Sequence, residues 1–149
     1  TDMALASYLS GITLANAGLG LVHGFASPIG GYFDIPHGVI CSALMAPCNK
    51  ITVRKLRSAG TNPEGLRKYA KVGRLFLHKE KKAEDYCTDA LLHLIESWTS
   101  EMKIPSLAHC GIKPEHFQKI VGNTDNKNNP VTLEPEEMLE VLSLSSKPR

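Results

Sequence analysis

The chain has 149 residues, of which 42% are hydrophobic and 21% charged, and its formal net charge is +2. This length fits one ordinary globular domain, and so small a charge does not favour nucleic acid or a membrane surface as a partner. No apolar run reaches the ~18 residues that a membrane-spanning helix needs. No basic start precedes an apolar stretch, as it does in a signal peptide. These observations predict a single soluble domain in the cytoplasm.

The first expected helix covers residues 2–17, where apolar side chains recur at helical spacing from the first turn. The sequence begins without methionine, and so apolar a helix at a free terminus indicates a piece of a longer protein. The next residues, 18–35, contain five glycines and Pro28. Because glycine and proline favour turns, we expect this segment to be rich in turns rather than helical.

A long helix is expected from Pro36 to Ser58, because proline fits the first helical turn, where its missing N–H costs nothing. Pro47 predicts a kink or a break in this helix. Residues 82–103 have the clearest helical pattern, with one apolar stripe formed by Tyr86, Cys87, Ala90, Leu91, Leu94, Ile95, Trp98 and Met102. Further helices are expected at 62–77, 113–123 and 134–144, and a polar loop at 123–132. The chain is therefore predicted to be all-α, without internal repeat or second domain.

The four cysteines, Cys41, Cys48, Cys87 and Cys110, are scattered and form no CxxC pair. Cys41 and Cys48 are seven residues apart, so they would lie on one face of a helix. This pattern favours buried free thiols in a reducing cytosol over a disulfide framework or a zinc site.

Two histidines, His23 and His37, flank the segment that is rich in glycine and proline. Neutral imidazole is the commonest metal ligand in proteins, and a firmly held cation needs at least one or two further protein ligands. Their spacing places one at the end of a helix and the other at the start of the next, with the intervening turn folding them together. The residues alone leave two interpretations open: half of a metal site, or two structural histidines beside helix ends.

The other histidines and the basic clusters give weaker indications of a binding site. We expect His78, His93, His109 and His116 to be solvated or in loops rather than to bind metal. The clusters Lys50/Arg54/Lys55/Arg57 and Lys79/Lys81/Lys82 lack interleaved aromatic residues, which weakens a role in binding nucleic acid. The sequence has no GxGxxG, P-loop or GxSxG motif.

Residues 18–39, "GLGLVHGFASPIGGYFDIPHGV", resemble the signature of the iron-containing alcohol dehydrogenases, which are related in fold to dehydroquinate synthase. Types of residue agree over more than twenty positions, from the apolar helix end with its histidine to the "PHG" that follows. Residues 104–121 and 126–142, "IPSLAHCGIKPEHFQKIV" and "NKNNPVTLEPEEMLEVL", are similar to the end of the same family's C-terminal domain. The resemblance covers essentially the whole chain.

The resemblance implies an α/β N-terminal domain that binds NAD or NADP and a helical C-terminal domain that binds a divalent metal, usually iron and sometimes zinc. One aspartate and three histidines hold the metal in that family, and two of the histidines match His23 and His37. The other two ligands come from an upstream Asp-x-x-x-His, and no such pair precedes His23. Residues 1–149 are thus expected to be a helical metal-binding domain, partial at its N-terminal side, with an incomplete metal site and without the nucleotide domain.

The same resemblance implies a reaction. The metal acts as a Lewis acid on the oxygen of a small alcohol or aldehyde, and hydride passes between the substrate carbon and the nicotinamide. Many members have a histidine four residues after the first ligand, where it is thought to relay a proton, but this chain has Ser27. Serine forms hydrogen bonds but does not titrate near neutral pH, so a catalytic role for Ser27 is in doubt.

Three hypotheses on function follow. In the first, the chain is the C-terminal half of a metal-dependent dehydrogenase, inactive alone and partnered by the missing nucleotide domain, with assembly into a homo-oligomer left open. In the second, it is a non-catalytic helical remnant or subunit without redox activity of its own. In the third, the chain is a small helical nucleic-acid binder, and this hypothesis has only the basic clusters in its support.

Overall fold

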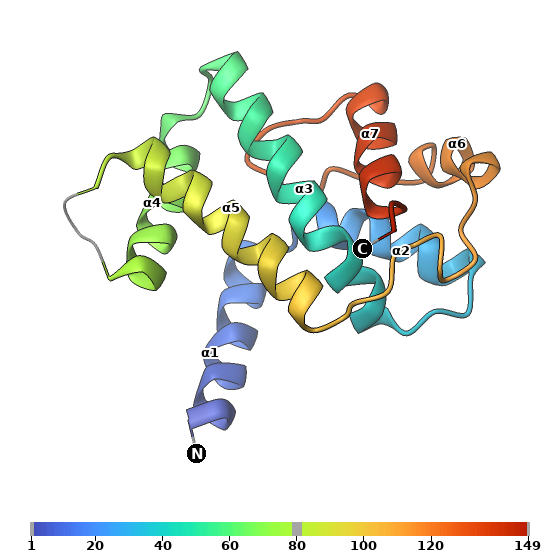
Figure 1. Ribbon diagram of the computed structural model, residues 1–149, viewed down its shortest axis with the longest axis horizontal. Coiled ribbons are helices and arrows are strands. Elements are labelled where there is room, and N and C mark those ends of the chain that lie inside the picture. The colour runs from blue at the N-terminus through green and yellow to red at the C-terminus, as the bar shows by residue number, and fades with distance from the viewer. Residues whose placement is uncertain (1, 79–81, 149) are drawn as a thin grey trace.

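The structure is a computed structural model that describes residues 2–78 and 82–148, and in these ranges it contains helices, turns and loops but no strand. The all-α prediction is therefore confirmed. Figure 1 shows how the helices are arranged. They are α1 (Asp2–Ala17), α2 (Leu21–Tyr32), α3 (His37–Ala59), α4 (Pro63–Leu77), α5 (Glu84–Glu101), the short 3₁₀ turn η1 (Pro114–His116), α6 (Phe117–Val121) and α7 (Pro135–Ser145).

The long helix α3 lies at the centre of the molecule and contacts α2, α4, α5 and α7 (Figure 1). Its buried side chains, among them Ile40, Leu44 and Ile51, join those of α2, α6 and α7 in one hydrophobic core. Pro47 does not break α3, which is one helix from His37 to Ala59. Of the kink or break that Pro47 predicts, the break does not occur, because Pro47 is itself buried in the packed interior and this packing offsets the loss of one backbone hydrogen bond.

Helices α4 and α5 lie side by side and make the most extensive contact between any two helices of the described chain. They approach so closely at Gly73 that a Cβ atom there would lie 2.1 Å from the carbonyl oxygen of Cys87. The predicted stripe on α5 is buried only in part. Cys87 and Leu91 are covered, whereas Tyr86 and Trp98 are exposed. Trp98 nevertheless packs against Phe76 of α4, so the stripe marks the side of α5 that faces α4, but α4 covers it only in part.

Residues 18–35 correct the sequence prediction, because most of them form the helix α2 instead of turns. Leu21, Phe25 and Ile29 from this helix are fully buried, and this burial outweighs the poor helix propensity of its glycines and of Pro28. Gly24 serves close packing rather than a turn: a Cβ atom at this position would lie 1.8 Å from the carbonyl oxygen of Asp125. The backbone of the 123–132 loop therefore rests directly against α2.

The loop at 123–132 is held by the side chains of its asparagines. Asn126 donates to the carbonyl of Leu133 and accepts from its N–H, and Asn129 donates to Thr52 of α3 and to the carbonyl of Val131. Asn128 donates from its side chain to the carbonyl of Ala17. These bonds fasten the loop across the junction of α1 and α2, next to the first turn of α2.

Helix α1 confirms the predicted helix at 2–17, yet it buries none of its residues and projects from the other helices (Figure 1). Its apolar side chains, such as Met3 and Tyr8 with 82% and 68% of their surface exposed, lie open. Within the described residues, no single helix is long and apolar enough to cross a membrane; α1 and α2 meet this criterion only as a pair, which is bent by 95°.

Candidate metal centre

His23 and His37 lie together although fourteen residues separate them. Their ring centroids are 5.4 Å apart and the ring planes are inclined by 42°. His37 is the first residue of α3, as predicted, but His23 lies in the first turn of α2 and not at the end of a helix. The structure therefore joins the N-terminal turns of two consecutive helices.

Chain geometry explains this meeting. From His23 to Tyr32 the helix rises by about 13–14 Å, at 1.5 Å for each residue. The five steps from Tyr32 to His37 span about 16–18 Å when extended. Phe33 and Pro36 do have extended or near-extended backbones, so this connection returns along α2 and places α3 beside its beginning.

A third donor that the sequence analysis missed lies beside the two imidazoles. The Sγ atom of Cys41 is 3.4 Å from Nε2 of His37, and one donor atom each of His23, His37 and Cys41 lies within 4.8 Å of the others. Burial raises the pKa of the Cys41 thiol above its ordinary value. The sequence does contain a signal, since His37 and Cys41 are separated by four residues and so share a helix face.

The prediction of buried free thiols is confirmed for Cys48 and Cys87 and is wrong about burial for Cys41 and Cys110. All four cysteines are free, but only Cys48 and Cys87 are buried, whereas Cys41 and Cys110 are half-buried. The half-buried Cys41 is the cysteine whose sulfur lies beside His37.

Ser27 lies one turn after His23 on α2 and is exposed. Residues four apart on a helix are neighbours on its surface, so Ser27 is on the same side of α2 as His23. Its hydroxyl can therefore reach the solvent that also reaches the two histidines.

The other histidines lie away from this cluster, as expected. His93 is exposed and its Nδ1 is 3.8 Å from a carboxylate oxygen of Glu96. The ring of His116 accepts a hydrogen bond from the backbone N–H of Lys113 and packs against Phe33. His78 and His109 are exposed. His116 thus has a structural role in the turn that begins at Pro114.

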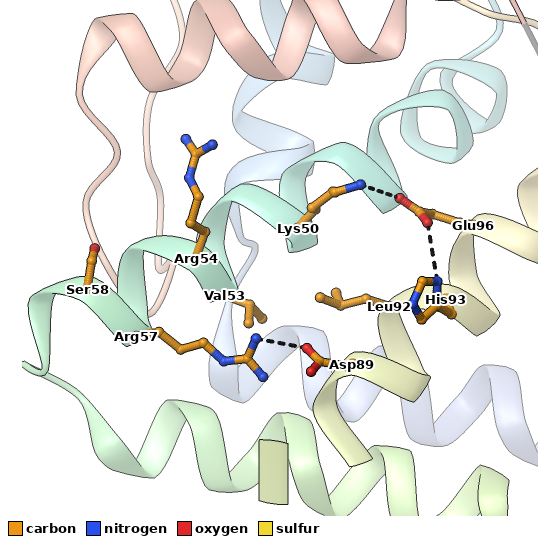
Figure 2. Close-up of a pocket in the computed structure, with 9 residues that line it drawn as sticks. All are labelled: Lys50, Val53, Arg54, Arg57, Ser58, Asp89, Leu92, His93 and Glu96. Carbon is orange, nitrogen blue, oxygen red and sulfur yellow. Dashed lines mark hydrogen bonds and ion pairs between the residues drawn. The ribbon is translucent and has the colours of Figure 1, made fainter. Parts of the chain in front are cut away.

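The basic cluster on α3 is exposed, as predicted, except for the half-buried Lys55, but its cations are paired with acids. Lys50 contacts Glu96 at 3.0 Å and Arg57 contacts Asp89 at 2.8 Å, across the cleft of about 660 Å³ between α3 and α5 (Figure 2). The two other cations contact α7, where Arg54 pairs with Glu140 and Lys55 with Glu137. Paired charges attract phosphate weakly. Of the second basic cluster, Lys79 and Lys81 lie outside the described residues.

The fold and the paired histidines define the class of protein: an all-helical domain that brings two imidazoles together from the beginnings of consecutive helices. Comparison with known proteins gives the family of this domain. Residues 1–145 match the model of the iron-containing alcohol dehydrogenase family, C-terminal part. The chain belongs to this family.

Individual relatives agree with this family assignment. The chain is 33% identical over 121 residues to alcohol dehydrogenase 4 of Schizosaccharomyces pombe, a match that covers 80% of this chain and 26% of that protein. It is 28% identical over 149 residues to the NADPH-dependent butanol dehydrogenase of Clostridium saccharobutylicum, covering 94% of this chain and 36% of the relative. The chain therefore spans about a third or less of the length of these relatives.

The solved structure of a 1,3-propanediol oxidoreductase has the same fold. It superposes with a TM-score of 0.76 and 23% sequence identity, over 96% of this chain and 37% of the other. The prediction of the helical C-terminal fold of this family is thereby confirmed.

Proposed function

We propose that this chain supplies the metal-binding half of a metal-dependent alcohol dehydrogenase, in which His23 and His37 bind a divalent cation, iron or zinc. The observation that carries the proposal is the meeting of two imidazoles from separate helix beginnings, with ring centroids 5.4 Å apart. Membership of the iron-containing alcohol dehydrogenase family supports the choice of cation and of reaction.

The two histidines fit such a cation. Neutral imidazole binds iron and zinc alike, with metal–nitrogen distances of about 2.0–2.1 Å for zinc. Two nitrogens that share a tetrahedral cation are therefore about 3.4 Å apart. The donor atoms here lie within 4.8 Å of one another, so small side-chain rotations bring them to that separation.

The proposed role of this chain is to hold the divalent cation and to orient the two imidazoles that bind it. The bound cation supplies Lewis acidity toward the oxygen of a small alcohol or aldehyde. The relative from Clostridium saccharobutylicum is named as NADPH-dependent, which supports a nicotinamide as the hydride carrier, NAD or NADP, bound outside these 149 residues. The rigid core beneath α2 and α3 keeps both imidazoles in place. The four free thiols favour a reducing compartment, the cytoplasm.

Ser27 is proposed to relay a proton between a bound alcohol and water, and not to act as a titrating acid or base. Its hydroxyl both donates and accepts hydrogen bonds, so Oγ can pass a proton between a bound alcohol and water without titrating itself. Positioned proton transfer by a titrating side chain is typically worth about 10²–10⁴-fold in rate. In the complete enzyme, Ser27→His is therefore expected to raise the rate of the proton-linked step, or to add a titration near pH ~6.5. Profiles of kcat and kcat/KM against pH, with metal content checked, measure this.

Calorimetry with Zn²⁺ tests the assignment of the two ligands. We expect a saturable one-to-one isotherm for the 149-residue chain, lost in His23→Ala and in His37→Ala. His109→Ala is the matched control, because it removes an exposed imidazole that is far along the chain from the cluster. Binding that survives both ligand substitutions would place the metal elsewhere and refute the proposal.

A second experiment separates this proposal from a non-catalytic helical subunit. We expect the 149-residue chain to be inert with NADH or NADPH and short aldehydes, because its sequence contains no dinucleotide-binding motif. Adding the upstream part of the protein should restore turnover, in a manner that depends on His23 and His37. Turnover by the 149-residue chain alone, or a complete protein that is indifferent to both substitutions, would contradict the assignment.

A further inference from the structure

We propose that Cys41 is a metal ligand in its own right, so that His23, His37 and Cys41 form a centre of two imidazoles and one thiolate. This inference rests on the proposed function, since it takes the cation to lie between the two histidines. It goes beyond that function by naming a sulfur donor and a preference among metals.

The distances agree with a shared cation. A zinc–sulfur bond of about 2.3 Å and a zinc–nitrogen bond of about 2.0–2.1 Å, set at a tetrahedral angle, place sulfur and nitrogen about 3.5 Å apart. The observed distance from Sγ of Cys41 to Nε2 of His37 is 3.4 Å. All three donors lie within 4.8 Å of one another, so the third donor, His23, needs at most a small side-chain rotation to complete the set.

The helix fixes this arrangement. His37 and Cys41 are four residues apart on α3 and so present their donors on one face. Between and beyond them, Ile40 and Leu44 are fully buried, which anchors this part of α3 in the core. Two of the three donors thus come from one rigid element, and only His23 comes from α2.

The site is open to a cation. His37 is exposed, and His23 and Cys41 are half-buried. Within these 149 residues, three ligands leave at least one coordination position of the cation open. Open positions are available to water and, in the complete enzyme, to upstream ligands or a substrate oxygen.

Sulfur changes which metal the site selects. Thiolate is a soft donor that favours zinc, whereas carboxylate and water suit manganese and magnesium. A metal-bound thiol is deprotonated: the Cys41 proton passes to water and Sγ donates a lone pair to the cation. We therefore infer that this chain prefers Zn²⁺ and Co²⁺ over Mn²⁺ more strongly than two imidazoles alone would.

Cobalt(II) spectroscopy tests this assignment without any turnover. Co²⁺ is titrated into the reduced 149-residue chain, into Cys41→Ser and into Cys110→Ser, which makes the same change at the other half-buried cysteine. We expect a near-ultraviolet sulfur-to-cobalt charge-transfer band in the parent chain and in Cys110→Ser, but not in Cys41→Ser. Circular dichroism confirms that each variant keeps its helical fold.

Competition with Zn²⁺ and Mn²⁺ gives a second measurement on the same variants. Loss of even an outer partner of a ligand costs about 10–100-fold in metal affinity, so loss of the thiolate should weaken Zn²⁺ binding by at least ~10-fold. Affinity for Mn²⁺ should change much less, because manganese gains little from sulfur.

The outcomes separate the two proposals. Cobalt bound through histidine, with no charge-transfer band and with unchanged Zn²⁺ affinity in Cys41→Ser, overturns the role of Cys41 and leaves the proposed function standing; the thiol is then only a hydrogen-bond partner of His37. A band that persists in His23→Ala and His37→Ala overturns the histidine pair. Absence of any cobalt binding by the parent chain overturns both.

Discussion

Helices α1 and α2 follow each other in the chain, and both are apolar, but their surroundings differ completely. α1 has a regular helical pattern and buries no residue, whereas α2 contains proline and three internal glycines and buries Leu21, Gly24, Phe25, Ala26, Pro28 and Ile29. Of these two helices, the one that the apolar pattern predicts has no cover in this chain, and the one that it does not predict forms part of the core. A pattern of apolar residues shows which face of a helix is to be covered, but not whether anything covers it.

The largest effect that separates the two helices should come from removing an aromatic ring. Phe25 in α2 is fully buried, so Phe25→Ala is expected to lower the free energy of unfolding by about 3–5 kcal/mol. Tyr8 in α1 has 68% of its surface exposed, and Tyr8→Ala should change stability by no more than about 0.5 kcal/mol. Urea unfolding followed by circular dichroism measures both. Equal losses in the two variants would show that α1 is covered in solution.

A glycine-to-alanine pair sharpens the contrast. At Gly24, the new Cβ atom would overlap the carbonyl oxygen of Asp125, so Gly24→Ala must displace the loop from α2 and should cost about 1–3 kcal/mol or more. At Gly11 in α1, nothing lies within 4 Å of the same atom, and alanine should stabilise the helix by about 0.5–1 kcal/mol. Because Gly24 is next to His23, only the first variant should also weaken Zn²⁺ binding. A Gly24→Ala chain with unaltered stability would show that this contact is looser than the structure indicates.

How far the sequence predicts this molecule depends on which residues are considered. The helices at α1, α4 and α7 follow from apolar spacing and from proline at the first turn, both of which are local signals. The helix α2 does not, because it is stabilised by the burial of Leu21, Phe25 and Ile29 in one core with residues of α6 and α7, about a hundred positions away along the chain. Local propensity is a weak constraint where tertiary burial is large.

The candidate metal centre also combines residues that the sequence indicates with a contact that no local pattern predicts. The resemblance to a known family indicated His23 and His37, and the structure brings their rings together. The spacing of Cys41 relative to the other cysteines predicts only a buried free thiol. Its separation of four residues from His37 is the local signal that places the two side chains side by side. The close approach of His23 to this pair depends on the length of α2 and of the returning segment, which no local pattern specifies.

The smallest expected effect concerns the helix at the other end of the chain. Unlike α1, α7 is tied to α3 by charges, and Arg54 donates two hydrogen bonds to the carboxylate of Glu140. These hydrogen bonds lower the pKa of Glu140 below its ordinary value. A carboxyl whose pKa is lower in the folded state stabilises the fold above its ordinary pKa, and this contribution is lost as the pH falls through the folded value.

Arg54→Gln should therefore destabilise the chain near neutral pH and lose this disadvantage in acid. Both side chains are substantially exposed, at 53% and 40%, so solvent screening limits the difference to about 0–1 kcal/mol. Urea unfolding of parent and variant at about pH 7 and about pH 3, on either side of the ordinary glutamate value of ~4.3, measures it. Arg67→Gln is the control, because among the described residues the guanidinium of Arg67 contacts a single acceptor, Glu64 on its own helix, at 3.4 Å. A difference at pH 7 that persists unchanged in acid would mean that Arg54 stabilises α7 through packing of its stem rather than through the charge of Glu140.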